Sequence, residues 1–336
     1  MRYVVIGAGA VGGTIGARLH QGGHEVVLVA RGEHLSAMQR DGLRLIAPDT
    51  DEVLEVTAVA GPDEVALRSD DVLVLATKSQ HTADALGPWA SSEVTHGELA
   101  GRPAAEVLPL LCAQNGVANE PAALRWFSRV VGMCVWLPSG LPEPGTVIAP
   151  CGPLTGMLHL GPYPAADPPP GLDATLAAVA ADLESSMFLA PRPPEVMAWK
   201  RAKLISNLGN AFDALFEPQS GWEELLEHAQ EEARAVFAAA GWSVTTAEEE
   251  AQVRRDLMKP QEIPGQERSG GSTYQSLARG ADSVETDYLN GEISAQGRRH
   301  DVRTPVNTAV QHLAARAVHA RVRARSLPLD ALHALL

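Results

Sequence analysis

Three cysteines in 336 residues are too few and too scattered to form a disulfide framework or a structural zinc site. Cys112, Cys134 and Cys151 show no Cys-x-x-Cys spacing and no adjoining histidine ligand pattern. We expect all three to be buried thiols in a reducing compartment, and we expect no metal site.

Positive charge is also scarce, since 27 Lys and Arg residues face 41 Asp and Glu residues and leave a formal net charge of −14. This balance disfavours general nucleic-acid binding and suits a protein that acts on a small molecule. No apolar run is long enough to span a bilayer, and the first apolar strand already begins at residue 3. We therefore expect no membrane segment, no signal peptide and a cytoplasmic location.

A glycine-rich turn follows that first apolar strand. The residues Gly7-Ala8-Gly9-Ala10-Val11-Gly12 form the pattern Gly-x-Gly-x-x-Gly, and a helical stretch and a second strand come after them. In such a motif the first glycine makes the tight turn, the second lets a pyrophosphate approach the backbone, and the third allows the helix to pack on the strand. The six residues are predicted to bind the phosphates of a dinucleotide at the start of the helix.

An acidic residue is missing where the second strand ends. That strand is expected over residues 24–30, and an NAD site would place a ribose-binding carboxylate at its end. Ala30 and Arg31 stand there instead, and a guanidinium suits the 2′-phosphate of NADP. Two other interpretations stay open: Arg31 is an ordinary surface residue, or Glu33 reaches back to the ribose.

Polar residues follow two further predicted strands. Thr77 and Lys78 come after an apolar strand at 71–76, and Gln114 and Asn115 come after one at 106–113. Ligands of open parallel sheets bind at the carboxyl ends of the strands. The two polar clusters and the glycine turn are therefore expected to meet at one edge of the sheet.

The chain length suggests two domains, and the pattern changes near residues 191–194. Residues 1–192 are predicted to form an α/β, Rossmann-type domain with a parallel sheet, and residues 193–336 an all-helical domain for substrate and catalysis. A further strand is expected at 130–137, and helices are expected at 172–186, 195–216, 223–240, 246–258, 282–299 and 305–324.

Two polar clusters fall on the predicted helices. Lys203, Asn207 and Asn210 are spaced i, i+4 and i+7 and would share one helical face. Taken alone, the lysine could be exposed and the asparagines could pair with backbone. Glu285 begins an acidic stretch that, by itself, reads as a solvated helix surface, and Ser272 stands where it could simply cap a helix.

Together these motifs resemble the ketopantoate reductases (2-dehydropantoate 2-reductases) over most of the chain. The landmarks occur in family order: Gly7–Gly12, Thr77-Lys78, Gln114-Asn115-Gly116, Lys203-Leu204 with Asn207, Ser272 with Gln275 and Leu277, Glu285-x-Asp287-Tyr288-Leu289-Asn290-Gly291, and Thr304-Pro305-Val306-Asn307.

The resemblance implies reduction of a 2-oxo acid to a 2-hydroxy acid by NADPH, with ketopantoate as substrate and pantothenate biosynthesis as the pathway. Lys203 would be the general acid on the ketone oxygen, and Glu285 would hold a substrate hydroxyl or orient the site. In the implied arrangement Lys78 steadies the cofactor and Asn115 links it to the lysine. The remaining implied residues, which grip substrate polar groups, are Asn207, Asn210 and Ser272.

The chain departs from the family pattern on the substrate side. Asn210 follows Lys203 by seven residues where eight are usual, Ser276 replaces a common Asp, and the spacing from Ser272 to Glu285 is one residue longer. The stretch 260–271 is also unusual. Reduction of another oxo acid therefore remains an alternative, as do a non-catalytic NADP-binding regulator and a flavin enzyme. The sequence is compatible with a homodimer but does not determine oligomeric state.

Overall fold

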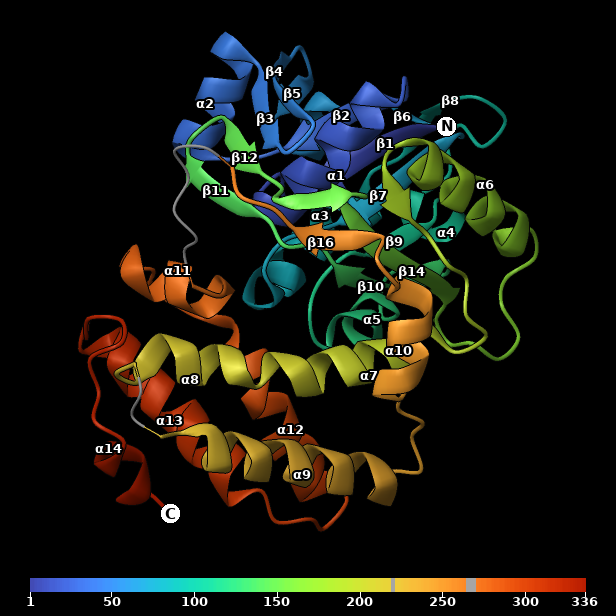
Figure 1. Ribbon diagram of the computed structural model, residues 1–336. Coiled ribbons are helices and arrows are strands. Elements are labelled where there is room, and N and C mark those ends of the chain that lie inside the picture. The colour runs from blue at the N-terminus through green and yellow to red at the C-terminus, as the bar shows by residue number, and fades with distance from the viewer. Residues whose placement is uncertain (219–220, 264–269) are drawn as a thin grey trace. The chain divides into compact units, whose positions relative to one another are not determined.

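Stretches that are distant in the sequence come together in two units (Figure 1). The structure is a computed structural model that describes residues 1–218, 221–263 and 270–336. The first unit comprises Met1–Gln114, Asn119–Val196 and Ala247–Gln266, and the second comprises Asn115–Ala118, Met197–Thr246 and Glu267–Leu336. The units thus differ from the continuous ranges 1–192 and 193–336, because two short stretches group with the other half of the chain.

An eight-stranded sheet forms the centre of the first unit, in the order β15-β14-β10-β9-β7-β1-β2-β5. Its strands are β1 (Arg2–Ile6), β2 (Glu25–Val29), β5 (Thr57–Val59), β7 (Asp71–Leu75), β9 (Leu110–Cys112), β10 (Val130–Trp136), β14 (Gly156–Pro162) and β15 (Phe188–Leu189). Only β10 and β14 pair in antiparallel fashion. The predicted Rossmann-type sheet is confirmed, and the carboxyl ends of β7, β1 and β2 meet at one edge.

Both faces of this sheet are buried, which explains why its strands are apolar throughout. Side chains of β1 alternate between two cores: Tyr3 and Val5 belong to one, and Val4 and Ile6 to the other. The helices and 3₁₀ turns of the unit are α1 (Ala10–Gln21), α2 (Gly32–Asp41), η1 (Pro62–Glu64), η2 (Ser79–His81), α3 (Thr82–Ser91), α4 (Ala104–Val107), α5 (Asn119–Ala123), α6 (Leu172–Ser185) and α10 (Ala247–Arg254). α1 and α6 contribute to the first core, and α3 contributes to the second.

The described part of the first unit also contains three smaller sheets. Four strands pair in the order β11 (Gly140–Glu143), β12 (Thr146–Ile148), β3 (Leu43–Ala47) and β4 (Thr50–Leu54). The two-stranded sheets join β6 (Leu67–Arg68) to β8 (Val94–His96), and β13 (Cys151–Pro153) to β16 (Met258–Pro260). Through β16, a stretch from the C-terminal half of the chain becomes part of the first unit.

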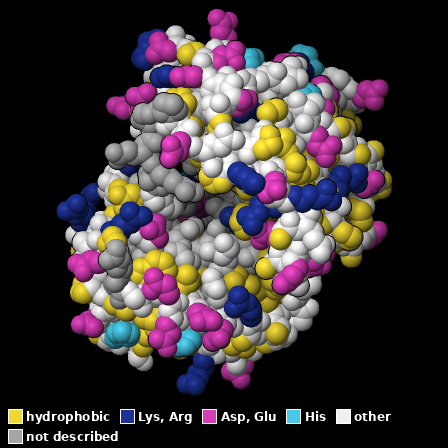
Figure 2. All heavy atoms as spheres, in the orientation of Figure 1, with side chains coloured by type: hydrophobic (Ala, Val, Ile, Leu, Met, Phe, Trp, Pro, Cys, Tyr) yellow, Lys and Arg dark blue, Asp and Glu magenta, His cyan; other side chains and the backbone are white. Residues whose placement is uncertain are grey.

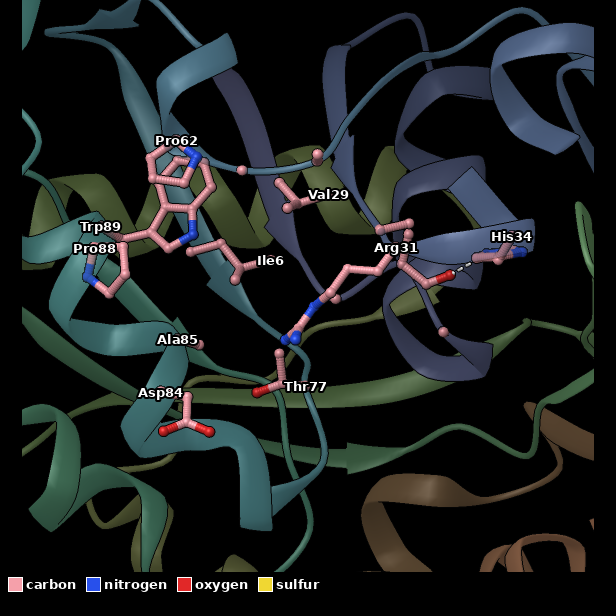
Figure 3. Close-up of a pocket in the computed structure, with 16 residues that line it drawn as sticks. Ile6, Val29, Arg31, His34, Pro62, Thr77, Asp84, Ala85, Pro88 and Trp89 are labelled. Atoms are coloured by element: carbon pink, nitrogen blue, oxygen red, sulfur yellow. Dashed lines mark hydrogen bonds between the residues drawn. The ribbon is translucent and has the colours of Figure 1, made fainter. Parts of the chain in front are cut away.

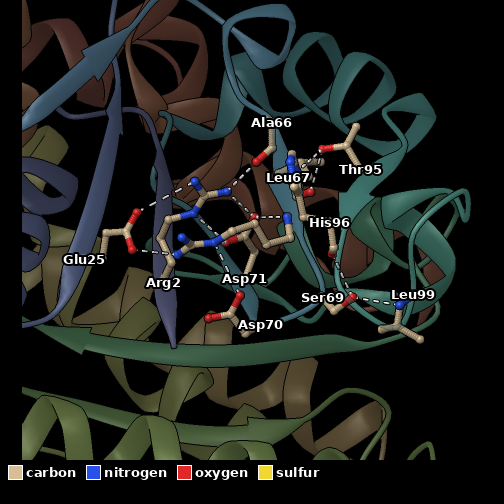
Figure 4. Close-up of polar contacts among 11 residues, drawn as sticks. Arg2, Glu25, Ala66, Leu67, Ser69, Asp70, Asp71, Thr95, His96 and Leu99 are labelled. Atoms are coloured by element: carbon tan, nitrogen blue, oxygen red, sulfur yellow. Dashed lines mark hydrogen bonds and ion pairs between the residues drawn. The ribbon is translucent and has the colours of Figure 1, made fainter.

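A buried ion pair fixes the amino ends of β1 and β7 (Figure 4). Arg2 donates from Nε and Nη2 to the two carboxylate oxygens of Asp71, each at 2.7 Å, and Asp71 also accepts from the Arg68 backbone N–H. Arg2 is 8% exposed and Asp71 1% exposed. Because the pair lies at the edge of the sheet opposite the glycine turn, its role is structural.

The second unit is helical, as predicted. Its elements are α7 (Val196–Asn207), α8 (Gly209–Leu215), α9 (Glu223–Ala239), α11 (Ser272–Ala278), the 3₁₀ turn η3 (Glu285–Tyr288), α12 (Asn290–Arg299), α13 (Pro305–His319) and α14 (Asp330–His333). Phe212, Phe216 and Val310 lie in its core. The Glu232 carboxylate accepts from the N–H groups of Val306 and Asn307 at the start of α13, so the Pro-x-Asn motif is a structural joint between α9 and α13.

Five predicted elements differ from the structure. The strand 106–113 is a helical turn followed by β9, and the helix 246–258 ends at Arg254 before β16. The helix 195–216 is interrupted at Leu208, the helix 282–299 is η3 followed by α12, and the helix 305–324 ends at His319. Long-range pairing overrides local propensity in several of these places, since residues 258–260 pair with β13 and Asn290 donates to Asn307.

Charged side chains of both signs are intermixed on the face shown in Figure 2. This distribution accompanies the net charge of −14. Within the ranges that the structure describes, no helix is both long and apolar enough to cross a membrane.

Candidate functional site

A cavity of about 350 Å³ opens beside the glycine turn in the first unit (Figure 3). Gly7, Ala8, Gly9 and Arg31, four of the residues predicted to bind the cofactor, line it. Ala10, Val11 and Gly12 follow directly in the first turn of α1. The structure therefore brings seven predicted cofactor residues to one place.

Two hydrogen bonds and two close backbone approaches shape the turn. The N–H groups of Gly7 and Ala8 both donate to the carbonyl of Val29, at 3.1 and 2.9 Å. Gly7 has a φ of +102°, and a Cβ there would lie 2.7 Å from the Thr77 backbone nitrogen. A Cβ on Gly12 would overlap the Gly7 carbonyl oxygen, whereas one on Gly9 would meet no described atom within 4 Å. Gly9 thus faces open space.

Arg31 lies two residues beyond the end of β2 and is the N-cap residue of α2. Its exposed side chain extends toward Thr77 in Figure 3. Glu33 is also exposed and does not line the cavity. The geometry thus favours Arg31 over Glu33 as the residue that faces a ligand in this cavity.

Several lining residues were not found from the sequence. Pro62, Pro88 and Trp89 group on the side of the cavity away from His34 (Figure 3). Trp89 is 3% exposed, so its ring is held firmly by the core. Flat apolar groups of this kind can pack against an aromatic base, while the glycine turn and Arg31 can hold anions. No local sequence pattern links these residues, because only tertiary packing brings them together.

A buried hydrogen-bond network holds the loop that carries Lys78. Gln114 donates to the Thr77 carbonyl at 2.9 Å and to the Thr82 hydroxyl at 2.7 Å. Asn119 accepts from Thr82 and donates to Ser79. Half-buried Lys78 follows Thr77, a cavity residue, so the network contacts the residues on both sides of it.

The second polar cluster belongs to the helices of the second unit. Lys203 and Asn207 lie on α7, and Asn210 lies on α8, beyond the interruption at Leu208. The side chain of Asn207 is 6% exposed, and its Nδ2 has no hydrogen-bond partner among the described residues. An amide N–H group that is buried in this way costs free energy unless a ligand or water accepts its hydrogen bond.

Glu285 begins η3 and is half-buried. The second unit also includes the loop 115–118, and Gly116 in this loop packs on the turn that Glu285 begins: a Cβ on Gly116 would lie 2.9 Å from the Tyr288 carbonyl oxygen. Gly116 has a φ of +79°, so a glycine suits this close approach. Asn115, predicted beside the cofactor, precedes Gly116 and groups with the second unit, and its role stays a prediction.

Ser272 is the first residue of α11, and Gly271 rather than Ser272 occupies the cap position. The Ser272 side chain lies outside the described part of the structure, as do residues 264–269 of the unusual stretch. A Cβ on Gly271 would lie 3.3 Å from the Asn210 Oδ1 atom, and the Gly271 N–H donates to Asp213 at 3.1 Å. The start of α11 thus lies against the Asn210 end of α8.

Family models match both halves of the chain. The model described as "Ketopantoate reductase PanE/ApbA" matches residues 3–164, and the one described as "Ketopantoate reductase PanE/ApbA C terminal" matches residues 195–317. Among curated proteins, the 2-dehydropantoate 2-reductase of Halobacterium salinarum is 29% identical over 320 residues, which cover 91% of this chain and 95% of the relative.

Solved structures share the fold along the whole chain. The PanE/ApbA family ketopantoate reductase of Ralstonia eutropha aligns with a TM-score of 0.74 at 26% identity, covering 96% of this chain and 99% of that one. A D-mandelate dehydrogenase solved with NADH and anilino(oxo)acetate also aligns with a TM-score of 0.74, at 22% identity and over 99% of this chain and all of that one.

Proposed function

Because the chain belongs to the ketopantoate reductase family, a family of oxidoreductases, we propose that it reduces 2-dehydropantoate to pantoate with NADPH. The observation that carries the proposal is the glycine-turn cavity lined by Arg31. Lys203 and Glu285, both present in a chain that matches the family in its two halves, support the chemistry.

The residues of the cavity suit the parts of NADPH. The glycine turn and the N-terminus of α1, a helix of 12 residues, provide N–H groups and a positive helix end for the pyrophosphate. Arg31 offers a guanidinium to the 2′-phosphate, and Lys78 steadies the phosphates as a second cation. The bound cofactor supplies the hydride that the ketone carbon accepts.

The polar residues of the second unit handle the substrate and the proton. Lys203 donates a proton from Nζ to the ketone oxygen, which becomes the hydroxyl of the product. Glu285 binds a substrate hydroxyl, and its negative charge favours the charged form of the Lys203 ammonium. The buried Nδ2 of Asn207 donates to an oxygen of the substrate, which satisfies the group that has no described partner. Asn210 and Ser272 contribute further polar contacts, and Asn115 connects cofactor and lysine.

Initial rates of NADPH oxidation by the purified protein test the proposal. Ketopantoate is compared with straight-chain, branched and aromatic 2-oxo acids, with NADH as the cofactor control. We expect rapid NADPH-dependent turnover of ketopantoate. Rapid turnover of another oxo acid, without turnover of ketopantoate, would mean that the protein catalyses the same reduction on that acid instead. Tight NADPH binding with no turnover of any oxo acid would favour a regulator.

The Arg31→Ala variant tests cofactor choice separately. Loss of a charge-assisted contact to the 2′-phosphate should weaken NADPH binding by about tenfold or more and leave NADH binding nearly unchanged. Fluorescence titration of both cofactors measures the two affinities. Equal losses for NADPH and NADH would mean that Arg31 does not read the 2′-phosphate.

We also propose that the protein is a cytoplasmic homodimer and that it acts on a small-molecule substrate in pantothenate biosynthesis. The net charge of −14 supports the small-molecule part, because it disfavours nucleic-acid binding. Analytical ultracentrifugation of the purified protein tests the oligomeric part.

A further inference from the structure

His34, in the first turn of α2, contacts two backbone groups from different parts of the first unit. Its Nε2 lies 2.7 Å from the carbonyl oxygen of Ala8 in the glycine turn, a contact drawn in Figure 3. Its Nδ1 lies 2.8 Å from the backbone nitrogen of Gly145, in the turn between β11 and β12. The ring therefore bridges the glycine turn and the β11–β12 hairpin.

The two contacts determine where the ring carries its proton. The Gly145 N–H can only donate, so Nδ1 must accept and has no proton. The Ala8 carbonyl can only accept, so Nε2 carries the proton and donates. His34 is thus held as the neutral Nε2–H tautomer, since a second proton on Nδ1 would point at the Gly145 N–H.

The contact at Ala8 orients a peptide inside the cofactor cavity. The Ala8 carbonyl and the Gly9 N–H belong to one planar, trans peptide group and point in opposite directions. Fixing the oxygen therefore fixes the direction of the Gly9 N–H. Gly9 has no side chain to hold this peptide, and a Cβ there would meet no described atom within 4 Å.

The far end of the bridge is itself well held. Gly145 has a φ of +81°, and a Cβ on it would lie 3.0 Å from the Cβ of Ala37, one turn along α2 from His34. The Gly145 carbonyl also accepts from the Arg44 N–H at 2.8 Å. The hairpin turn is thus held in place, and through its hydrogen bond to this turn the His34 ring can hold the glycine turn in position.

We propose that His34 is a positioning residue for the nicotinamide cofactor, which holds the Ala8–Gly9 peptide in its binding orientation through the neutral Nε2–H tautomer. The proposal rests on the proposed function, in which this cavity binds a dinucleotide. The glycine turn meets the pyrophosphate that NADPH and NADH share, so His34 acts equally on both cofactors. Arg31, by contrast, is expected to act on NADPH alone.

Fluorescence titrations with NADPH and NADH test the proposal on the full-length protein. His34→Leu removes both hydrogen bonds and should raise both dissociation constants by about tenfold, by a similar factor for the two cofactors. In His34→Gln the amide nitrogen can replace Nε2 and should recover most of the affinity. In His34→Asn the amide reaches only the Nδ1 end and should not. Ser36→Ala, an exposed change on the same helix, is the matched control and should bind as the wild type does.

Three results would overturn the assignment. If His34→Leu lost NADPH but kept NADH, the ring would contact the 2′-phosphate directly. If His34→Leu bound both cofactors with wild-type affinity, the hydrogen bonds of His34 to Ala8 and Gly145 would have no effect on cofactor binding. If His34→Leu did not fold, equal affinities of His34→Gln and His34→Asn would exclude the role of Nε2. A wild-type protein that bound neither cofactor would instead overturn the proposed function, and this assignment with it.

Discussion

Lys203 is the residue on which the proposed chemistry depends most directly. It lies on α7 one turn before Asn207, whose buried Nδ2 has no hydrogen-bond partner among the described residues. Lys203→Ala removes the proton donor for the ketone oxygen and should lower kcat by about 10²–10⁴-fold. Steady-state kinetics at saturating substrate and NADPH measure the change.

Lys259→Ala is a suitable control for that experiment, because Lys259 is an exposed residue of β16 that pairs with Asp256. It should leave kcat unchanged, and Lys203→Ala should leave NADPH binding intact. A wild-type kcat in Lys203→Ala would remove Lys203 from the catalytic role.

The residues that the sequence identifies are those whose backbone position alone restricts their identity. Gly7 is recognisable because its positive φ favours glycine, and Gly9 and Arg31 because of their places in the glycine motif and at the end of β2. His34 and Trp89 could not be found in this way, since their places at the cavity depend on contacts with segments far away in the sequence. The binding and catalytic roles of all these residues, of the glycines and Arg31 as well as of Lys203, Glu285 and the asparagines, remain predictions.

Two glycines in the turn from β1 into α1 should affect stability and cofactor binding differently when each is replaced by alanine. Gly12→Ala would overlap the Gly7 carbonyl and approach the Ala76 Cβ to 2.9 Å, so it should lower both the Tm and the cofactor affinity. Gly9→Ala meets no described atom and should keep the Tm while it blocks the approach of the cofactor. Thermal unfolding and NADPH titration of both variants measure this; a Gly9→Ala protein with unchanged NADPH affinity would contradict the placement of the pyrophosphate.

Strand β14 carries a histidine that should make stability depend on pH. His159 is fully buried opposite Cys134 of β10, and burial lowers its pKa from the ordinary 6.5 to about 4, against a hydrogen bond with the Cys134 backbone. Between these values the unfolded chain binds a proton that the folded protein does not. The free energy of unfolding should therefore fall by about 3 kcal/mol from this group as the pH drops from 7 to 4.

Urea denaturation of wild type and His159→Gln across that pH range measures the contribution. The variant should lose this part of the pH dependence, and exposed His312→Gln should keep it. Parallel curves for the wild type and His159→Gln would mean that His159 is not neutral in the folded protein.

Elements with a strong local pattern were predicted within a few residues, and elements decided by distant partners were not. The strand 71–76 and the helix 172–186 match β7 and α6 closely because their apolar spacing is unambiguous. The helix 282–299 was wrong at its start: Leu289 adopts non-helical angles, and Asn290 is held by Asn307. Glu285 consequently lies on a 3₁₀ turn, which the acidic composition of the segment does not reveal.

At the scale of the whole molecule, the expected burial of the three cysteines is confirmed, and their strands predict an order of reactivity. Cys112 and Cys134 lie in the eight-stranded sheet, whereas Cys151 lies in the two-stranded sheet with β16. Short, peripheral pairings open more often than central strands, so Cys151 should react first with a thiol reagent. Labelling under native conditions, followed by mass spectrometry of peptides, measures the order.

Cys151→Ser should remove the fastest labelling phase and leave the slower phases unchanged. Labelling of Cys112 or Cys134 before Cys151 would show that the β13–β16 pairing is as stable as the central sheet.

The route of the chain between the two units limits how the protein can be recombined. The chain passes from one unit to the other five times. Residues 115–118 belong to the second unit although the residues on both sides of them belong to the first, and residues 247–266 belong to the first unit although the residues on both sides of them belong to the second. A chimera with a relative that exchanges everything after residue 192 would pair β13 of one parent with β16 of the other. Exchange of substrate preference between relatives therefore requires segments to be transferred in matched sets, and a single crossover is expected to yield poorly folded hybrids.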